Sequence, residues 1–487
     1  MKNWLYDKVI VEKLNNLFGL FVLISCGVIL GVVIAFLGTK GGAIILVGLI
    51  GVPIAIYTLI NNQFGYLFLM VFSTFIGYIS RVLSINVPFG VGIDLLLFLM
   101  FSGIVLEQIF SNREGKSKDF SLTNPVSVML IIWVAYLLLQ AFNPAGTLAG
   151  WLFGLRNIIR VIMAFVIAQR VFKDMKSVDI FVNTFIGIGL IVALYGIYQE
   201  IVGLPDYDLK WATATEERIN LLFIQGKWRK WSFLSDPAIF GLFMAFGSIV
   251  GFILSLGPYG WKRRCFFVIA AICMLLAMLF SGTRTAYVML PLAVIIYVLI
   301  NISKIKTLVF AIISLMLFIV VYFGPFYSKP IVRFRSAFNP SEDASMNLRD
   351  YNRQRIQPYI HSHPIGGGLT TSGSYGERFS PQHPLAGFPP DSGFMETLLE
   401  LGWIGLIIQL TMYAVILSVG VDNYYSCRSD KTRYYYAAFI ASFFALTIAL
   451  YAKKNIEQFP QNLILYGIFV LMYKMRQFDK NETKNLT

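Results

Sequence analysis

The polar stretch from about Gly324 to Gly405 carries many of the side chains in this sequence that could do chemistry. It lies between apolar segments and contains six arginines and all three histidines: Arg333, Arg335, Arg349, Arg353, Arg355, Arg378, His361, His363 and His383. Guanidinium groups bind phosphate oxygens through paired hydrogen bonds, and histidines and carboxylates transfer protons. The stretch is therefore a candidate for binding a polyanion and acting on it. The alternative is a loop whose basic residues only contact lipid head groups.

Asp391 is the most interesting acid–base candidate in this stretch. It follows two prolines and precedes Ser392-Gly393 at the start of an apolar segment. A carboxylate there could remove a proton from a hydroxyl within hydrogen-bond reach, or it could cap the helix that follows. Glu396 and Glu400 lie four residues apart on that predicted helix and so share a face. The other candidates are Asp236, Asp350, His361, His363 and His383.

Further cations lie in separate parts of the chain. Arg156 and Arg160 are four residues apart, and Arg284 ends a tight turn that starts at Ser281. Segment 202–236 adds Arg218, Lys227, Arg229 and Lys230, interspersed with Trp211, Trp228 and Trp231. An arginine in a narrow turn at a membrane surface is costly without a partner. As alternatives, Arg156 and Arg160 pair with a helix end or extend to the interface, and residues 227–230 form a solvated, lipid-touching face.

The composition predicts the elements that must position these residues. The chain has 487 residues, of which 57% are hydrophobic and 14% charged, with a mean hydropathy of +0.69. Soluble proteins have about 25% charged residues, and a membrane span needs about 20 apolar residues. We therefore predict an all-α polytopic membrane protein with about 12–14 transmembrane helices. The fourteen predicted spans are 17–37, 42–60, 64–80, 90–110, 124–142, 155–171, 179–201, 237–256, 265–282, 285–301, 305–324, 393–419, 433–452 and 460–474.

The predicted organisation has three parts. Residues 1–324 form a membrane domain with spans 1–11, residues 325–392 form a large loop between the eleventh and twelfth spans, and residues 393–487 hold the last spans and a tail. We expect the polar end, Phe478–Thr487, to be disordered.

The distribution of Lys and Arg predicts the orientation in the membrane. If the N-terminus is inside, nearly every inside connection is basic, including Lys262-Arg263-Arg264 and residues 428–433. Both termini are then cytoplasmic, and the 325–392 loop is outside, in the periplasm of a Gram-negative cell. Four separated parts of the chain send cations to that outer surface, which indicates a polyanion bound near the outer leaflet, with diphosphate the obvious candidate.

Several classes of function are excluded or disfavoured. The sequence has no phosphate-binding P-loop and no dinucleotide-binding or zinc-protease motif, and its four cysteines lack metal-ligand spacing, so we predict no metal site. The net charge of +14 is not gathered in one soluble basic domain, so nucleic acid is rejected as a partner. Asp94 is the only possible midplane carboxylate, which disfavours a proton-coupled transporter.

Three segments carry a family resemblance. They are Phe280-Ser-Gly-Thr-Arg284-Thr-Ala286, the run from Arg349 to Arg355 followed by His363-Pro-Ile-Gly-Gly-Gly368, and Asp391-Ser392 followed after nine residues by Gly402-Trp-Ile-Gly405. Ser232 to Pro237 also looks like the start of the family's preceding span. In this order and spacing, the chain resembles the superfamily of O-antigen ligases and O-antigen polymerases, bacterial integral-membrane glycosyltransferases, over about residues 150–420. The ligases have His where this chain has Asp391, which puts the specific ligase label in doubt.

The resemblance implies a function in lipopolysaccharide or other surface polysaccharide synthesis at the inner membrane. Such a protein moves a glycan from undecaprenyl diphosphate to an acceptor hydroxyl at the periplasmic face, with inversion and without metal or cofactor. The acceptor is lipid A–core for a ligase and another glycan for a polymerase, and membrane lipids are further partners. Asp391 and Arg284 are then expected to be catalytic, Arg156, Arg160, Arg349 and Arg353 to bind diphosphate, and His363, His383 and Glu396 to support them. The alternative is a transporter or flippase of polysaccharide or lipid-linked sugar.

Overall fold

The structure is a computed structural model. It describes residues 51–83, 89–112, 121–224, 226–234, 236–327, 329–336, 338, 344–390, 392–451 and 458–484, with six further residues between 21 and 31. The chain divides into two compact units, Met1–Asn61 and Asn62–Thr487. The first unit includes the apolar helix Gly51–Ile60, whereas the predicted span 17–37 and the first part of 42–60 lie largely outside the described residues.

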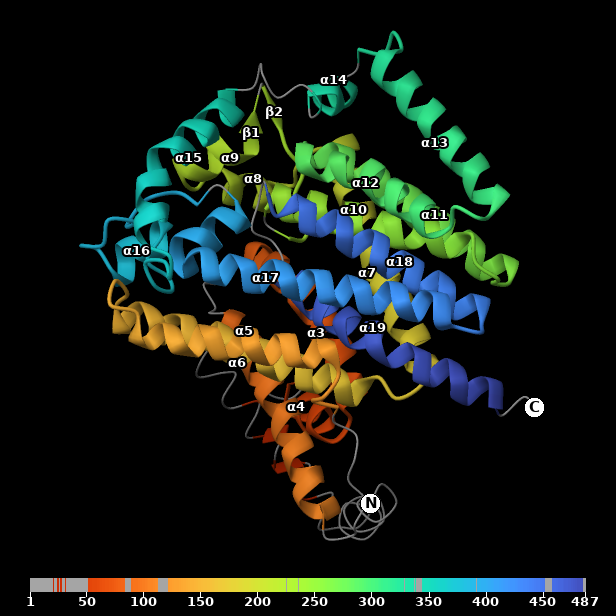
Figure 1. Ribbon diagram of the computed structural model, residues 1–487, viewed down its shortest axis with the longest axis horizontal. Helices are drawn as coiled ribbons and strands as arrows, with labels where there is room; N and C mark the ends of the chain where they lie inside the picture. The colour runs from red at the N-terminus through yellow and green to blue at the C-terminus, as the bar shows by residue number, and fades with distance from the viewer. Residues whose placement is uncertain are drawn as a thin grey trace. The chain divides into compact units, whose positions relative to one another are not determined.

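The second unit is a bundle of long helices (Figure 1), which confirms the predicted all-α membrane architecture. Each helix follows from a long apolar run in the sequence, and eight of the described helices are long and apolar enough to cross a bilayer. The helices that match predicted spans are α3 (Asn62–Leu83), α4 (Phe89–Asn112), α5 (Pro125–Leu139), α6 (Leu148–Val171), α7 (Met175–Ile201), α10 (Pro237–Ser255), α11 (Trp261–Ser281), α12 (Arg284–Ile300), α13 (Ile305–Phe323), α17 (Gly393–Ser426), α18 (Asp430–Ala449) and α19 (Gln461–Lys484). The chain is therefore a multi-pass membrane protein.

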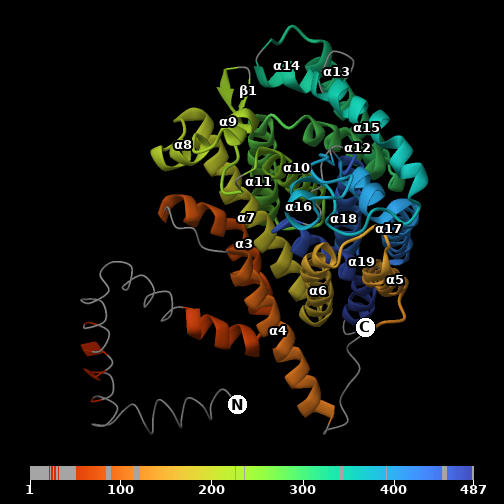
Figure 2. The same cartoon turned by 90° about the vertical axis from the view of Figure 1, so that its left-hand side faces the viewer.

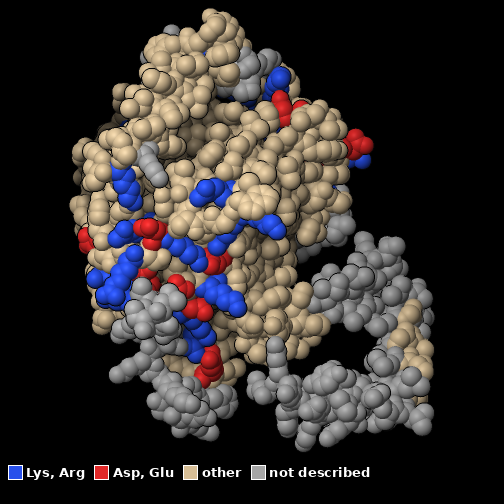
Figure 3. Space-filling view, turned by 90° about the vertical axis from the view of Figure 1, so that its right-hand side faces the viewer, with Lys and Arg blue, Asp and Glu red and all other residues tan. Residues whose placement is uncertain are grey.

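One end of the bundle, which we call the basic end, joins the starts of α7, α11 and α18. There Asp179 accepts hydrogen bonds from Arg263 at 3.0 Å and from Lys431 at 2.6 Å. Figure 3 looks onto this end and shows Lys and Arg side chains gathered on it, with Asp and Glu among them. The positive-inside rule predicts that this end faces the cytoplasm.

The opposite end, which we call the loop end, carries the segments that sequence analysis predicted to be outside (Figure 2). Residues 202–236 form α8 (Asp206–Ala212), α9 (Glu216–Leu222) and a hairpin of β1 (Phe223–Ile224) and β2 (Lys227–Trp228). The 325–392 segment includes α14 (Lys329–Ser336), α15 (Ala344–Ser362) and α16 (Gly373–Phe379). The large predicted loop thus contains three helices among its described residues.

The C-terminal segment differs from its prediction. Helix α19 continues to Lys484, so the expectation of disorder from Phe478 is wrong for residues 478–484, whereas residues 485–487 lie outside the described part of the chain. The physical reason is Asp479, which is buried and accepts the backbone N–H groups of Arg428 at 2.8 Å and Ser429 at 3.1 Å. These bonds fix the end of α19 to the connection between α17 and α18.

Helix α17 is interrupted at Gly402, and the interruption receives part of the large loop. Gly402 has φ 67° and ψ −168°, and the freed carbonyls of Leu399 and Glu400 accept the N–H groups of Gly367 at 2.8 Å and Gly368 at 2.9 Å. The Tyr136 hydroxyl donates to the Leu401 carbonyl at 2.6 Å. The glycine run after His363 is therefore hydrogen-bonded into the break.

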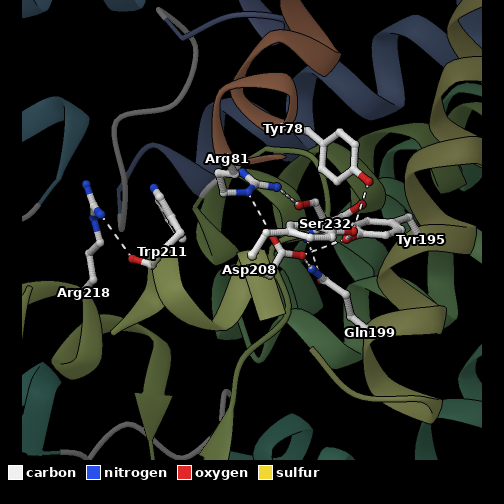
Figure 4. A network of polar contacts seen from close by, with 9 residues as sticks. Tyr78, Arg81, Tyr195, Gln199, Asp208, Trp211, Arg218 and Ser232 are labelled. Atoms are coloured by element: carbon white, nitrogen blue, oxygen red, sulfur yellow. Dashed lines mark hydrogen bonds and ion pairs between the residues drawn. The ribbon is translucent and has the colours of Figure 1, made fainter. Parts of the chain in front are cut away.

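A buried ion pair fastens segment 202–236 to the bundle (Figure 4). Arg81, near the end of α3, donates to Asp208 of α8 at 2.9 Å and to the Ser232 carbonyl at 2.6 Å. Both charged side chains are almost fully buried. Asp208 also accepts the Tyr195 hydroxyl and the Gln199 amide, each at 2.8 Å. Each Asp208 oxygen is hydrogen-bonded. Removing one partner of such a buried ion pair lowers the free energy of unfolding, because the other charge stays buried without compensation.

Replacing Arg81 with Met is expected to destabilise the protein by about 3–5 kcal/mol, because it leaves the Asp208 charge buried without its cation. Adding Asp208→Asn removes that charge and restores part of the loss. Thermal unfolding of the detergent-solubilised protein measures both effects. Arg218→Met is the matched control, since Arg218 stacks on the same Trp211 ring as Arg81 but at a less buried site. Equal Tm values for Arg81→Met and the control would contradict this account.

Candidate functional site

The turn between α11 and α12 is held rigidly at the loop end. Gly282, with φ 63°, ends α11 in the left-handed conformation, and Arg284 begins α12. The Arg229 guanidinium donates to the Ser281 carbonyl at 2.9 Å and to the Thr283 hydroxyl at 3.0 Å. The Thr283 hydroxyl in turn donates to the Pro237 carbonyl at 2.9 Å. These bonds fix the position from which the Arg284 side chain extends.

Four arginines from separate segments approach one another at this turn, and we call them the arginine cluster: Arg229, Arg284, Arg333 and Arg349. Arg333 of α14 lies against the turn, since a Cβ placed on Gly282 would be 2.8 Å from its Nη1. It also donates to the Ile224 carbonyl of the hairpin at 3.2 Å. The charges of Arg333 and Arg349 are close enough to repel that of Arg284. Elements distant in the sequence thus bring four cations to one place.

The electrostatics of the arginine cluster favour an anionic ligand. Burial lowers the pKa of the Arg229 guanidinium, and the charges of Arg333 and Arg284 lower it further, while Asp236 opposes them. Asp236 caps α10, accepting the N–H groups of Ala238 at 2.6 Å and Ile239 at 3.2 Å. Like charges held together by the fold repel one another, and an anion with several oxygens relieves that repulsion.

The other predicted diphosphate ligands lie in different surroundings. Arg156 and Arg160 both bind Asp94 of α4, Arg156 at 2.6 Å. Arg353 of α15 pairs with Asp350 at 3.2 Å and contacts the Tyr451 hydroxyl, with its guanidinium 4.1 Å from the centre of that ring. Of the predicted arginines, the structure therefore brings Arg284 and Arg349 together in the arginine cluster.

The start of α17 adjoins the position predicted for the base. Asp391 itself lies outside the described residues. Its neighbour Ser392 caps α17, accepting the Met395 N–H at 3.0 Å, and the Gly393 N–H donates to the Leu450 carbonyl at 2.9 Å. Glu396 follows in the first turn of the helix and is half-buried. Leu450 precedes Tyr451, so the contact of Arg353 with Tyr451 places that arginine near the start of α17.

The histidines and Glu400 make contacts that hold the loop together. His363 stacks on Tyr359 with ring centroids 4.0 Å apart. His383 accepts the Leu385 N–H through Nδ1 at 3.1 Å, and burial lowers its pKa, which keeps the ring neutral at pH 7. Buried Glu400 accepts the Thr370 N–H at 2.9 Å and the Ser372 hydroxyl at 2.6 Å. These contacts position the polypeptide around the site.

Sequence reasoning missed the role of Arg229. The interpretation of residues 227–230 as a solvated, lipid-touching face is wrong for Arg229, which binds the 281–283 turn, and for Lys230, which is buried and pairs with Glu200 at 3.3 Å. The physical reason is that Trp231, the next residue in the chain, is fully buried, so the residues directly before it also pack against the protein. The tryptophans of segment 202–236 were the available signal in the sequence. Tryptophan side chains bury large apolar areas, so several of them among the cations indicate a packed segment.

Comparison with known proteins finds one family for part of the chain. Residues 269–410 match the family described as O-antigen ligase (Wzy_C). No curated protein matches the chain. The matched region includes the turn before α12, Arg333, Arg349 and the break in α17, whereas Arg229 lies before it. Over residues 269–410, this membrane protein is therefore similar to the O-antigen ligase (Wzy_C) domain family.

Proposed function

We propose that this protein is a glycosyltransferase that moves a glycan from undecaprenyl diphosphate to an acceptor hydroxyl at the periplasmic face of the inner membrane. The observation that carries the proposal is the arginine cluster, which lies at the loop end and takes three of its four members from the region that matches the O-antigen ligase family. A diphosphate has the charge and the number of oxygens to bind several guanidinium groups at once.

The proposed chemistry follows from the leaving group. The acceptor oxygen attacks the anomeric carbon from the face opposite the diphosphate, the bond from that carbon to the phosphate oxygen breaks, and the anomeric configuration inverts. Negative charge grows on the departing diphosphate, and donors already fixed in place stabilise it without reorganising. Arg284 and Arg349 hold the diphosphate in this proposal, with Arg229 and Arg333 beside them. No metal or cofactor is required, because the four guanidinium groups supply the positive charge.

A general base must take the acceptor proton, and we assign this role to Asp391. The support is its place in the sequence beside the N-terminus of α17, whose positive end favours a carboxylate. Glu396, one turn further along α17, is the second carboxylate at this helix start. His363 and His383 support the loop through their ring contacts.

Transfer by the purified protein tests the proposal. The protein in nanodiscs receives a fluorescent glycan on undecaprenyl diphosphate together with candidate acceptors, and we expect labelled product and free undecaprenyl diphosphate. A flippase predicts movement of the lipid-linked glycan across the bilayer with no product, and that result would overturn the proposal. The pairing of Asp94 with two arginines weakens the transporter alternative, since this carboxylate is held in ion pairs.

A deletion strain separates the two glycosyltransferase classes. Loss of long chains, with single repeats still attached to the surface lipid, indicates a polymerase. Loss of all attached glycan, with lipid-linked polymer accumulating, indicates a ligase.

A further inference from the structure

A second basic group lies near the loop end, and we call it the Asp94 group: Asp94 of α4 with Arg156 and Arg160 of α6. Arg156 binds Oδ2 of Asp94 at 2.6 Å through both Nε and Nη2, and Arg160 binds Oδ1. Two guanidinium groups therefore share one carboxylate, which leaves a net charge of +1. The side chains of Arg156 and Asp94 are 41% and 26% exposed, so the Asp94 group is partly accessible.

The Asp94 group is set into an apolar surface. Asp94 lies five residues into α4, roughly 8 Å along the helix axis, and Arg156 eight residues into α6, roughly 12 Å. The neighbouring side chains on both helices are apolar and exposed: Val91, Leu95, Leu152 and Ile159. In a membrane protein an exposed apolar surface of this kind is suited to contact with lipid. Charged groups on a lipid-facing surface are costly unless they meet a polar partner.

The two basic groups are separated at the loop end. Figure 2 shows α4 and α6 on one side of α16, and α11, α12 and α14, which bear or adjoin the arginine cluster, on the other. Figure 1 shows the same separation. An anion at the Asp94 group is therefore distinct from one at the arginine cluster, and it approaches from the lipid beside α4 and α6.

We propose that the Asp94 group binds the phosphate of the lipid-anchored acceptor. This inference rests on the proposed function, in which a donor and an acceptor, both anchored in the outer leaflet, meet at one reaction centre. The donor diphosphate needs the concentrated charge of the arginine cluster. An acceptor that is held through the phosphate of its own lipid anchor needs a second cationic site, located at the depth of the lipid head groups. Asp94 binds both guanidinium groups, and the partly exposed Arg156 side chain donates to the phosphate oxygens.

The competing explanation is a brace between α4 and α6. A brace needs only that the two helices stay packed, and replacing an ion pair by apolar residues of similar size often preserves packing. A phosphate site needs the guanidinium groups themselves. The triple variant Asp94→Leu/Arg156→Leu/Arg160→Leu therefore separates the two explanations.

The test is two-substrate kinetics in nanodiscs of zwitterionic phospholipid. The acceptor is the one that the wild-type protein uses, offered once with its lipid phosphate and once as the same glycan on an uncharged alkyl anchor. For Arg156→Gln and the triple variant we expect the KM for the phosphorylated acceptor to rise about tenfold or more, as loss of a charge-assisted contact predicts. The KM for the donor and the rate with the uncharged acceptor stay unchanged. Arg378→Gln, which removes an exposed arginine of α16, is the matched control.

Three outcomes in the zwitterionic nanodiscs would overturn the inference. They are a raised KM for the donor, an equal defect with both acceptors, and wild-type kinetics of the triple variant, which indicates a brace. Repeating the assay in nanodiscs of anionic phospholipid tests whether a bulk lipid is the ligand. Competition by that lipid would raise the wild-type KM for the acceptor. A kinetic defect of the variants that is confined to the anionic nanodiscs also contradicts the proposal. Absence of transfer by the wild-type protein instead contradicts the proposed function itself.

Discussion

Replacing Arg284 with Ala is expected to lower kcat/KM for glycan transfer from undecaprenyl diphosphate by about 100- to 1000-fold. This is the usual size of the loss when one fixed donor to a developing negative charge is removed. Arg284 is close enough to Arg333 and Arg349 for their charges to repel its own, and it begins α12 directly after the turn that Arg229 holds. Its loss removes one of the four positive charges of the arginine cluster.

The effect is expected to fall on transfer and not on folding. The hydrogen bonds that hold the turn come from Arg229 and Thr283, so the backbone at position 284 keeps its support in the alanine variant. Removing one of several like charges also relieves the repulsion among the remaining arginines. Arg284→Lys keeps the charge but loses the planar, two-pronged geometry, so it should show an intermediate loss.

Initial rates with purified protein at varied donor concentration measure this prediction. Arg378→Ala is the matched control, because Arg378 lies on the exposed face of α16 in the same large loop, with its guanidinium 5.2 Å from the centre of the Phe379 ring. Thermal unfolding confirms that each variant is folded. An Arg284→Ala protein with the wild-type Tm and the wild-type kcat/KM would exclude this residue from the site and remove the main support for the proposed function.

The fold was predictable where one physical signal dominates. Apolar runs of about 20 residues cannot stay in water and cannot cross a bilayer except as helices, so the spans from α3 to α19 follow from the sequence. The boundaries were less predictable. Helix α6 begins at Leu148, seven residues before the predicted span, because Thr147 caps it by accepting the Gly150 N–H at 3.2 Å.

The site was predictable only in part, because its geometry depends on contacts between distant segments. The tight turn at Arg284 and the arginines of the large loop are visible in the sequence. What the sequence does not show is that Arg229, about 50 residues earlier, binds that turn, or that Asp94 binds both Arg156 and Arg160. Each of these pairings joins segments that are far apart in the sequence, and no local pattern shows which segments meet.

The interruption of α17 at Gly402 is the clearest case of a contact between distant segments. A substitution at Gly402 is expected to have the second large effect, on stability. Gly402→Ala is expected to destabilise the protein by about 4 kcal/mol or more, the sum of backbone strain and overpacking. The backbone at Gly402 has a φ of 67° with an extended ψ, which is essentially confined to glycine. A Cβ there would lie 2.5 Å from the Gly366 nitrogen and closer still to the Pro364 carbonyl. Both are backbone groups that cannot rotate away.

The consequence reaches the site because the same contact holds the large loop. Moving Pro364 and Gly366 away from α17 breaks the bonds from Gly367 and Gly368 to the freed carbonyls of the helix. The segment that joins α15 to α16 then loses its hydrogen bonds to α17, and we expect a lower Tm together with loss of glycan transfer. Gly187→Ala is the matched control, since Gly187 is a helical glycine in α7 with no atom within 4 Å of an added Cβ, and it should leave the Tm unchanged or slightly raised. A Gly402→Ala protein as stable as this control would show that the loop docks on α17 without the close backbone approach, and the break would then need another explanation.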